Sequence, residues 1–310
     1  MGEETMDLAA DHAVEAILRD ELAREARALA AVVPVLRHLL SADADALVSD
    51  AVLARVRGMI LDIAAQLDAA LAGRDPAVRE GGDPAAREAL AGRLMGDEAL
   101  LAHCHALAAE SLIAGRLQQR QALDPVLSPL LQELIASPDP EVAGLAMSAL
   151  AAQSRFVQGQ RRMELPLWEL PAELFHALVA HAQASAPDSG ALVRLQAGYD
   201  EAATRIGLLA RLVAAMRRGA VAALALDHAG LALFASALAA AARTAREAAV
   251  LACHEGQAAR LALLLRAAGL GSEAAERQRL LLAPGAPLPP GLAALSPEQA
   301  AALAGAATAR

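Results

Sequence analysis

The chain has little of what builds a β-sheet. Of its 310 residues only five are aromatic, whereas alanine alone supplies 84. Aromatic and β-branched residues favour strands, and alanine is the strongest helix former. The composition therefore predicts an all-α protein, and the length is sufficient for one large domain or two of ordinary size.

Lysine and asparagine are absent, so all 27 basic residues are arginines against 36 acidic ones, and the net charge is −9. We interpret the missing lysine as the mark of a GC-rich genome rather than of a function. Acidic residues outnumber basic ones by seven within residues 1–50. Nucleic-acid binding requires clustered positive charge, so we expect no nucleic-acid partner.

Cysteine is scarce, and no stretch has the form of a targeting or membrane segment. Cys104 and Cys253 lie in Ala/Leu-rich sequence, which is typical of small buried thiols in a reducing cytoplasm. The N-terminus is acidic and lacks the basic and apolar parts of a signal peptide. The most apolar region, 219–242, is interrupted by Asp227-His228. We therefore expect a cytoplasmic protein that neither spans nor binds a membrane.

Motifs that carry chemistry are also missing. The sequence contains no CxxC, HExxH, P-loop, GxGxxG or GxSxG pattern, so we expect no catalytic residue, no metal and no cofactor. His103-Cys104-His105 resembles a metal triplet, but residues two apart on a helix point about 200° away from each other. The alternative is a helical-bundle enzyme or a metal or cofactor binder. Its site would lie near His228, Cys253, His254 and Glu255.

The most informative stretch is 126–152. Its apolar residues up to Ile135 recur at spacings of three and four, which predicts one helix. Ser137-Pro138-Asp139-Pro140 then ends that helix, and Asp139 and Pro140 suit the start of the next. A short turn between two amphipathic helices predicts an antiparallel pair over 124–158. This pair resembles a HEAT repeat, which implies a HEAT-like α-solenoid or an irregular antiparallel helical array.

The wider stretch 137–179 (SPDPEVAGLAMSALAAQSRFVQGQRRMELPLWELPAELFHALV) resembles a bacterial all-helical family known only as a domain of unknown function. The likeness extends to AVLACHEGQAARLALLLRAAGL at 249–270. The resemblance implies an all-helical fold and a bacterial, cytoplasmic origin, and it carries over no catalytic residue.

Proline, glycine and charge predict the organisation of the chain. We expect a helical array over 1–163, a helical region over 164–283 packed on it, and a linker with a loosely docked tail helix over 284–310. Within these regions the expected helices are 6–40, a second one ending at Leu71, 85–95, 97–121, 172–184, 192–216, 228–246 and 246–269. Four Asp-Pro pairs, at 75, 83, 124 and 139, have the form of helix starts. The 192–216 segment has a heptad pattern, which suits either a homodimer seam or the core-facing stripe of a bundle helix.

The candidate binding residues follow the HEAT-like pair. Arg155, Gln158 and Arg162 are spaced i, i+3, i+7 and Arg161 flanks them, so they can hydrogen-bond carboxylates or phosphates on a partner. The alternative is that arginines in the last turns of a helix offset its dipole and stay solvated. The sequence favours a non-catalytic protein-interaction scaffold or regulatory adaptor with a protein partner.

Overall fold

The computed structural model describes residues 47–78, 81–185, 189–285 and 292–306, and every regular element within them is a helix. The expected all-α class is therefore confirmed for the described chain. The chain divides into two compact units, Met1–Asp50 and Ala51–Arg310. The helix expected over 6–40 lies outside the described residues, so the following description concerns the second unit.

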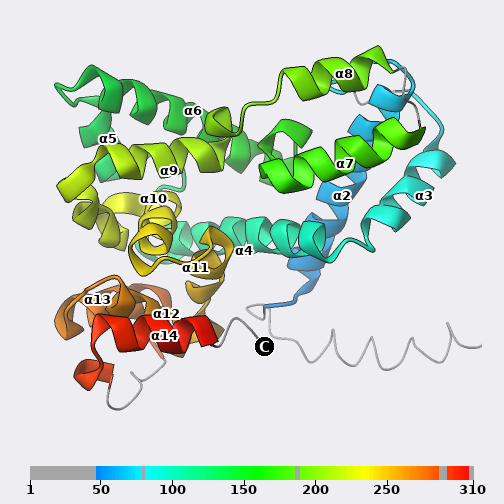
Figure 1. The fold of residues 1–310 in the computed structure, drawn as a ribbon. Helices are drawn as coiled ribbons and strands as arrows, with labels where there is room; N and C mark the ends of the chain where they lie inside the picture. Colours follow the sequence, from blue (N-terminus) through cyan, green and yellow to red (C-terminus); the bar gives the residue numbers. More distant parts are fainter. Residues whose placement is uncertain (1–46, 79–80, 186–188, 286–291, 307–310) are drawn as a thin grey trace, which may run out of the picture. The chain divides into compact units, whose positions relative to one another are not determined.

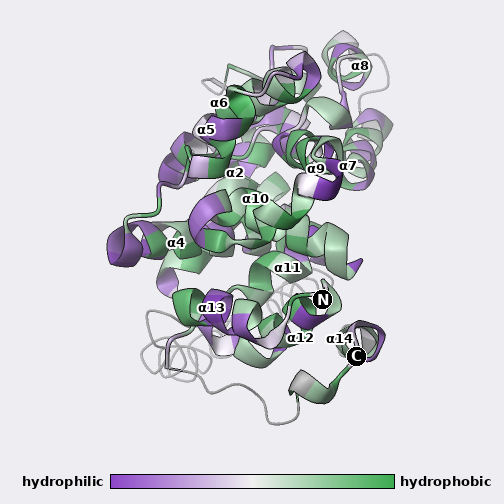
Figure 2. Ribbon diagram, turned by 90° about the vertical axis from the view of Figure 1, so that its left-hand side faces the viewer, coloured by the Kyte–Doolittle hydropathy of each residue, from purple (hydrophilic) through white to green (hydrophobic). Residues whose placement is uncertain are grey.

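Two clusters of buried apolar side chains form the core of this unit. The first cluster joins α2 (Asp50–Leu71), α3 (Pro84–Leu94), the first half of α4 (Glu98–Gln121), α7 (Ala172–Ser185) and α8 (Gly190–Ala197). The second joins the rest of α4 to α5 (Pro129–Ile135), α6 (Pro140–Arg162), α9 (Arg205–Ala215), α10 (Leu226–Ala242), α11 (Arg246–Ala252), α12 (Ala258–Ala267) and α13 (Ser272–Leu282). Figure 1 shows α4 crossing the view between the two groups. In Figure 2, α10 is mostly hydrophobic, in keeping with its burial.

The first cluster takes segments from both sides of residue 163. The core therefore does not divide at the expected boundary, and α4 contributes to both clusters. The domain limits 1–163, 164–283 and 284–310 stay predictions.

Helix starts follow local capping chemistry. Asp83 and Asp139 each accept a hydrogen bond from a first-turn amide and precede a proline, as predicted. The other two Asp-Pro predictions are wrong. Asp75-Pro76 lies in a turn, and Asp124 accepts from the amides of Val126 and Leu127 in a turn of its own.

The predicted pair of helices exists as α5 and α6, but α5 starts only at Pro129, capped by Ser128. The turn at Asp124 accounts for the delay, since it holds Val126 and Leu127 outside the helix. On α6, Leu145, Ala149 and Ala152 are buried in the second cluster, whereas Phe156 packs against the first. The relation of this pair to HEAT repeats and to a solenoid stays a prediction.

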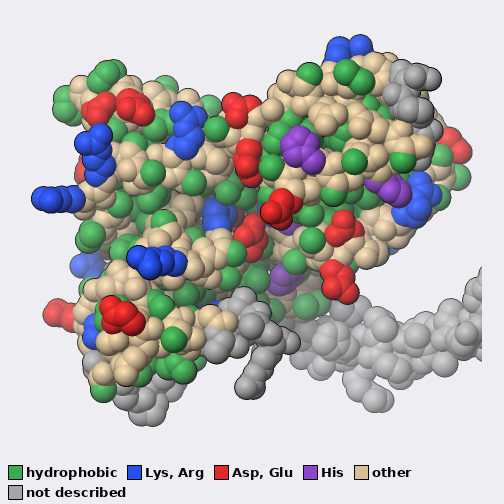
Figure 3. All heavy atoms as spheres, viewed as in Figure 1, with side chains coloured by type: hydrophobic (Ala, Val, Ile, Leu, Met, Phe, Trp, Pro, Cys, Tyr) green, Lys and Arg blue, Asp and Glu red, His purple; other side chains and the backbone are tan. Residues whose placement is uncertain are grey.

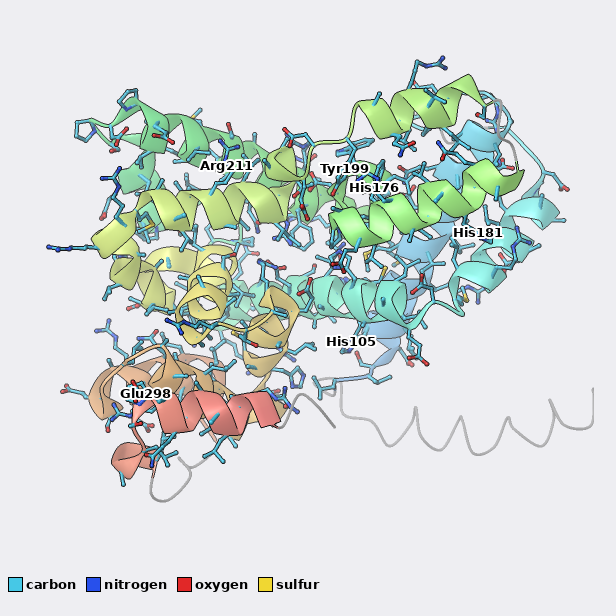
Figure 4. All side chains as sticks on the ribbon, in the orientation of Figure 1. His105, His176, His181, Tyr199, Arg211 and Glu298 are labelled. Atoms are coloured by element: carbon cyan, nitrogen blue, oxygen red, sulfur yellow. The ribbon has the colours of Figure 1, made fainter. Side chains whose placement is uncertain are left out.

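The continuous helix predicted over 192–216 is wrong. The chain forms α8, the 3₁₀ turn η2 (Glu201–Ala203) and α9, which Thr204 caps through its side chain. Tyr199, an expected seam residue, leaves the helical path and stacks on Phe175 at 4.0 Å between ring centroids. His176 lies beside it, with its ring centroid 5.3 Å from that of Tyr199 (Figure 4). A homodimer stays a prediction, but it cannot form through one continuous helix over 192–216.

The helices predicted over 228–246 and 246–269 also differ from the structure. Gly230, at φ +69°, kinks α10, and the second helix is broken between α11 and α12 by the 3₁₀ turn η4 (Glu255–Gln257). The expectation of a loosely docked tail is wrong for α14 (Pro297–Ala306). This helix packs along α12 (Figure 1), and Arg266 Nε donates to the Leu295 carbonyl at 2.8 Å. The predicted capping box is present, since the Gln299 amide donates to Ser296 Oγ and the Ser296 amide donates to Gln299 Oε1.

Within the described residues no single helix is long and apolar enough to cross a membrane. One pair, the 3₁₀ helix η3 (Arg217–Leu224) and α10, reaches that length and composition together, with a bend of 114° between them.

Candidate functional site

A cavity of about 220 Å³ lies between α6 and the connector that follows it. Helix α6 contributes Arg155, Gln158 and Arg162, and α9 contributes Arg205 and Ile206 at its start. Among the described residues, the side chains and backbone that line it are those of Leu107, Arg155, Phe156, Gln158, Gly159, Arg162, Glu164, Leu165, Pro166, Trp168, Glu169, Arg205 and Ile206. We call this space the α6 cavity. It combines apolar walls with arginine side chains.

Buried polar groups of α2 hold the connector in place. The Leu165 amide donates to Asp62 Oδ2 at 2.9 Å, and the Leu167 amide donates to Gln66 Oε1 at 2.9 Å. Gln66 Nε2 donates in turn to the Leu165 carbonyl at 3.0 Å. These bonds satisfy connector groups that would otherwise be buried without partners.

The same anchoring determines where Trp168 points. Leu165, Leu167 and Leu170 are buried in the first cluster, and this leaves Trp168 between them 41% exposed at the cavity. Trp168 is the only tryptophan of the chain. Tryptophan side chains half-exposed beside a pocket are common anchors of protein interfaces.

The wall of the cavity contains a buried charged network. Glu110 of α4 accepts hydrogen bonds from Arg205 Nη1 and Nη2 at 2.8 and 2.9 Å, and from Arg246 Nη1 and Nη2 at 2.9 and 2.7 Å. The Arg205 guanidinium lies 3.7 Å from the centroid of the Phe156 ring, a cation–π contact. Gln153 Oε1 accepts another bond from Arg205 at 3.1 Å. The network therefore ties α4, α6, α9 and α11 together behind the cavity.

The ionisation of Glu110 follows from these contacts. Burial alone would raise the pKa of its carboxyl, but the charges of Arg205 and Arg246 and their hydrogen bonds hold it well below the usual range. Glu110 is thus an ionised carboxylate with a structural role, and each of its oxygens accepts hydrogen bonds from both guanidinium groups.

Glu169 lines the cavity from the connector. Its Oε2 accepts from the Arg205 backbone amide at 2.7 Å. Burial raises the pKa of the Glu169 carboxyl, while this hydrogen bond and the charges of Arg205 and Arg155 act in the opposite direction. The carboxylate therefore caps the start of α9 and lies within electrostatic reach of Arg155.

The four candidate binding residues do not share one cavity. Arg155, Gln158 and Arg162 line the α6 cavity, whereas Arg161 lines a different one. Arg162 Nε already donates to Glu164 Oε2 at 2.8 Å. Arg155 is exposed and forms no hydrogen bond or salt bridge within the described chain. Of the four, Arg155 is therefore the side chain best placed to receive a ligand in the α6 cavity.

The four residues of the alternative site make separate contacts. His228 Nε2 lies 3.1 Å from Glu133 Oε1, and Cys253 is buried with its Sγ directed to the Ala249 carbonyl at 3.3 Å. His254 Nδ1 accepts from the Gly256 amide, and Glu255 faces Arg120 at 3.5 Å. The described residues hold no group of three or more His, Cys, Asp or Glu side chains that could bind a metal ion.

The network of Glu110, Arg205 and Arg246 behind the cavity was not predicted from the sequence. Glu110 and Arg205 are 95 residues apart, and Glu110 and Arg246 are 136 apart. No local pattern joins them, because an isolated charged residue on an Ala-rich helix is usually solvated. The one available signal was the proline-bounded connector that holds the only tryptophan.

Charged side chains are interspersed over the face shown in Figure 3, with acidic ones near its middle and arginines toward its left edge.

Comparison of the chain with protein-family models, curated proteins and solved structures finds no match. The described residues form an all-helical protein with a cavity beside α6 that arginine, glutamate and apolar side chains line. The likeness to HEAT repeats and to a bacterial family stays a prediction.

Proposed function

We propose that this chain is a non-catalytic interaction protein, a scaffold or adaptor, which binds a protein partner in the α6 cavity. The observation that carries the proposal is the placement of Trp168 and Arg155 around one cavity of about 220 Å³. Tryptophan and arginine are the residue types most enriched among the energetically dominant contacts of protein interfaces.

The residues that line the cavity indicate which kind of segment of a partner would bind there. Phe156, Leu165, Ile206 and Trp168 offer apolar surface that suits one large side chain. Arg155, which has no ion-pair partner among the described residues, suits a carboxylate next to it. An acidic segment with an aromatic or aliphatic residue would satisfy both features.

The first experiment is capture from extracts of cells that produce the protein, using the full chain and two variants of the cavity, Arg155→Glu and Trp168→Ala. The matched control is Arg194→Glu, since Arg194 is exposed on α8 and lines neither this cavity nor the one that contains Arg161. We expect the wild type and the control to retain the same protein and the cavity variants to lose it. Substitutions of the exposed Arg155 and Arg194 shift stability by roughly 0.5 kcal/mol or less, so the thermal midpoints of Arg155→Glu and Arg194→Glu should stay close to that of the wild type.

The captured protein is then titrated against the chain while the fluorescence of Trp168 is followed. Because no other tryptophan is present in the chain, a shifted emission locates binding at the cavity. Arg155→Glu should raise the Kd tenfold or more, since one charge-assisted contact contributes about 1.5–3 kcal/mol. Capture of nothing by the wild type, or equal capture by Arg155→Glu and Arg194→Glu, would refute the proposal.

A further inference from the structure

A second cavity, of about 160 Å³, shares Phe156 with the α6 cavity but is otherwise lined by different residues. Arg55 on α2 and Arg161 on α6 line it, and α10 contributes Leu231 and Ala232. We call it the α4 cavity, because α4 provides the largest share of its lining. Nothing in the proposed partner binding uses it.

The charge of the α4 cavity is uneven. Arg55 and Arg161 are its two basic side chains, and Glu110 is its one acidic side chain among the described residues. Both oxygens of Glu110 are already held by the guanidinium groups of Arg205 and Arg246. The positive charge of Arg55 and Arg161 is therefore not balanced by an acid of the cavity wall. Such an excess is notable in a chain with a net charge of −9.

Several donor atoms of the two arginines have no acceptor among the described residues. The Nε of Arg55 is buried without a partner in the described structure, while its Nη1 donates to the Ala51 carbonyl at 3.1 Å. Arg161 makes no hydrogen bond or ion pair within the ranges that the structure describes. The Nη2 group of Arg55 and the guanidinium of the exposed Arg161 can therefore donate to a ligand that accepts hydrogen bonds.

Helix α4 adds a polar strip to these arginines. Ser111, Gly115 and Gln118 are spaced i, i+4, i+7, so they lie on one side of the helix and all line the cavity. The side chains of Ser111 and Gln118 form no hydrogen bond among the described residues, so both can donate to a ligand. At Gly115 an added Cβ would meet no atom within 4 Å. The glycine thus leaves open space between the two donors.

We propose that the α4 cavity binds a phosphate group, supplied either as inorganic phosphate or by a small phosphorylated molecule. A phosphate presents several strong acceptor oxygens and two negative charges, and arginine is the side chain best suited to bind it in a bidentate manner. Arg55 and Arg161 reach the group from two helices, and the hydroxyl of Ser111 and the amide of Gln118 donate from a third. The remaining volume admits a small organic substituent.

The test is calorimetric titration of the full chain with inorganic phosphate and, separately, with glycerol phosphate, at constant ionic strength set with chloride. Two variants act on the cavity by different means. Arg161→Gln removes a charge, and Gly115→Leu fills the space without displacing an atom that a Cβ would meet. Leucine also favours a helix more than glycine does, so the fold is retained. Arg194→Gln is the matched control for loss of an exposed arginine, and Arg155→Gln reports on the α6 cavity.

We expect saturable binding of one phosphate per wild-type chain and unchanged binding by Arg194→Gln and Arg155→Gln. Arg161→Gln should weaken binding at least tenfold, and Gly115→Leu should abolish it. Tighter binding of glycerol phosphate would identify a phosphorylated small molecule as the ligand, and tighter binding of inorganic phosphate would identify the free ion. Absence of saturation in the wild type, or binding by Gly115→Leu equal to that of the wild type, would overturn the proposal. Since Arg155 lines only the α6 cavity, this result is independent of the proposed partner binding.

Discussion

Replacing Glu110 by glutamine should be among the most destabilising conservative substitutions in this chain. In the native protein Oε1 accepts from Arg205 Nη1 and Arg246 Nη2, and Oε2 accepts from Arg205 Nη2 and Arg246 Nη1, all at 2.7–2.9 Å. A glutamine can accept only two of these four bonds. Its amide group would also place N–H donors against two guanidinium groups that donate as well.

The magnitude follows from burial. Glu110 and Arg205 are 2% and 3% exposed at the side chain, so water cannot replace the lost acceptor. Removing one partner of a buried ion pair costs about 3–5 kcal/mol, because the other charge is left uncompensated. We expect Glu110→Gln to lower the free energy of unfolding by about that amount, measured by urea denaturation followed by circular dichroism at pH 7.

The exposed ion pair between Arg57 and Glu88 provides the control. It has a similar distance of 3.0 Å, but its side chains are 64% and 60% exposed. Glu88→Gln should change the free energy of unfolding by less than about 1 kcal/mol, since exposed pairs contribute little. If Glu110→Gln costs no more than Glu88→Gln, the network does not stabilise the fold and our account of the core is wrong.

The effect of Glu110→Gln should also depend on pH. The two arginines hold the folded-state pKa of Glu110 below its usual range. The stability from its carboxylate is therefore fully present above the unfolded-state pKa, about 4.3, and is lost as the pH falls from there through the folded-state pKa. The difference between wild type and Glu110→Gln should shrink on acidification below about pH 4, and a difference that grows instead would contradict the assignment.

Two further predictions concern packing and the thiols. Gly207→Ala should destabilise the protein by about 1–3 kcal/mol, because its Cβ would collide with the Glu201 carbonyl, whereas Gly144→Ala, with nothing within 4 Å, should stabilise α6 by up to about 1 kcal/mol. Thermal unfolding of both variants measures this, and shifts of the same sign would contradict it. Burial raises the pKa of Cys104 and Cys253 to about 12, so iodoacetamide at pH 8 should modify neither in the folded chain and both in denaturant. Mass spectrometry provides the readout, and rapid alkylation of the folded chain would show that the thiols are accessible.

The elements that the sequence predicted correctly are those with local causes. Asp83 and Asp139 accept hydrogen bonds from amides within three residues and precede a proline that fits the first turn. The same signal failed at Asp124, where the side chain closes a turn instead. An aspartate can cap a helix or close a turn, and here α5 starts instead at Pro129, with Ser128 as its cap and with Leu130 and Leu131 buried.

The prediction of one continuous helix over 192–216 was wrong for a different reason. Apolar residues continue at spacings of three and four across the break, so periodicity alone could not detect it. The contact of Tyr199 with Phe175, and its hydroxyl hydrogen bond to the Leu170 carbonyl at 2.9 Å, pull the chain out of the helix. Thr204 then caps a new one. These contacts join residues about 24 and 29 positions apart, so the spacing of apolar residues within one helix cannot predict them.

The amino-acid sequence by itself determined that the chain is helical, where several helices begin, and that Arg155, Gln158 and Arg162 lie along one side of α6. Each of these follows from alanine content, from capping within a turn, or from the 3.6-residue period. Only the tertiary structure decided that Trp168 joins Arg155 at a cavity and that Arg161 faces another. It also decided that Glu110 is buried between two arginines. Those outcomes depend on bonds from Asp62 and Gln66 to a connector about 100 residues away and on a network that spans 136 residues. Such contacts form only when distant helices pack, because burial removes the water that would otherwise satisfy each group separately.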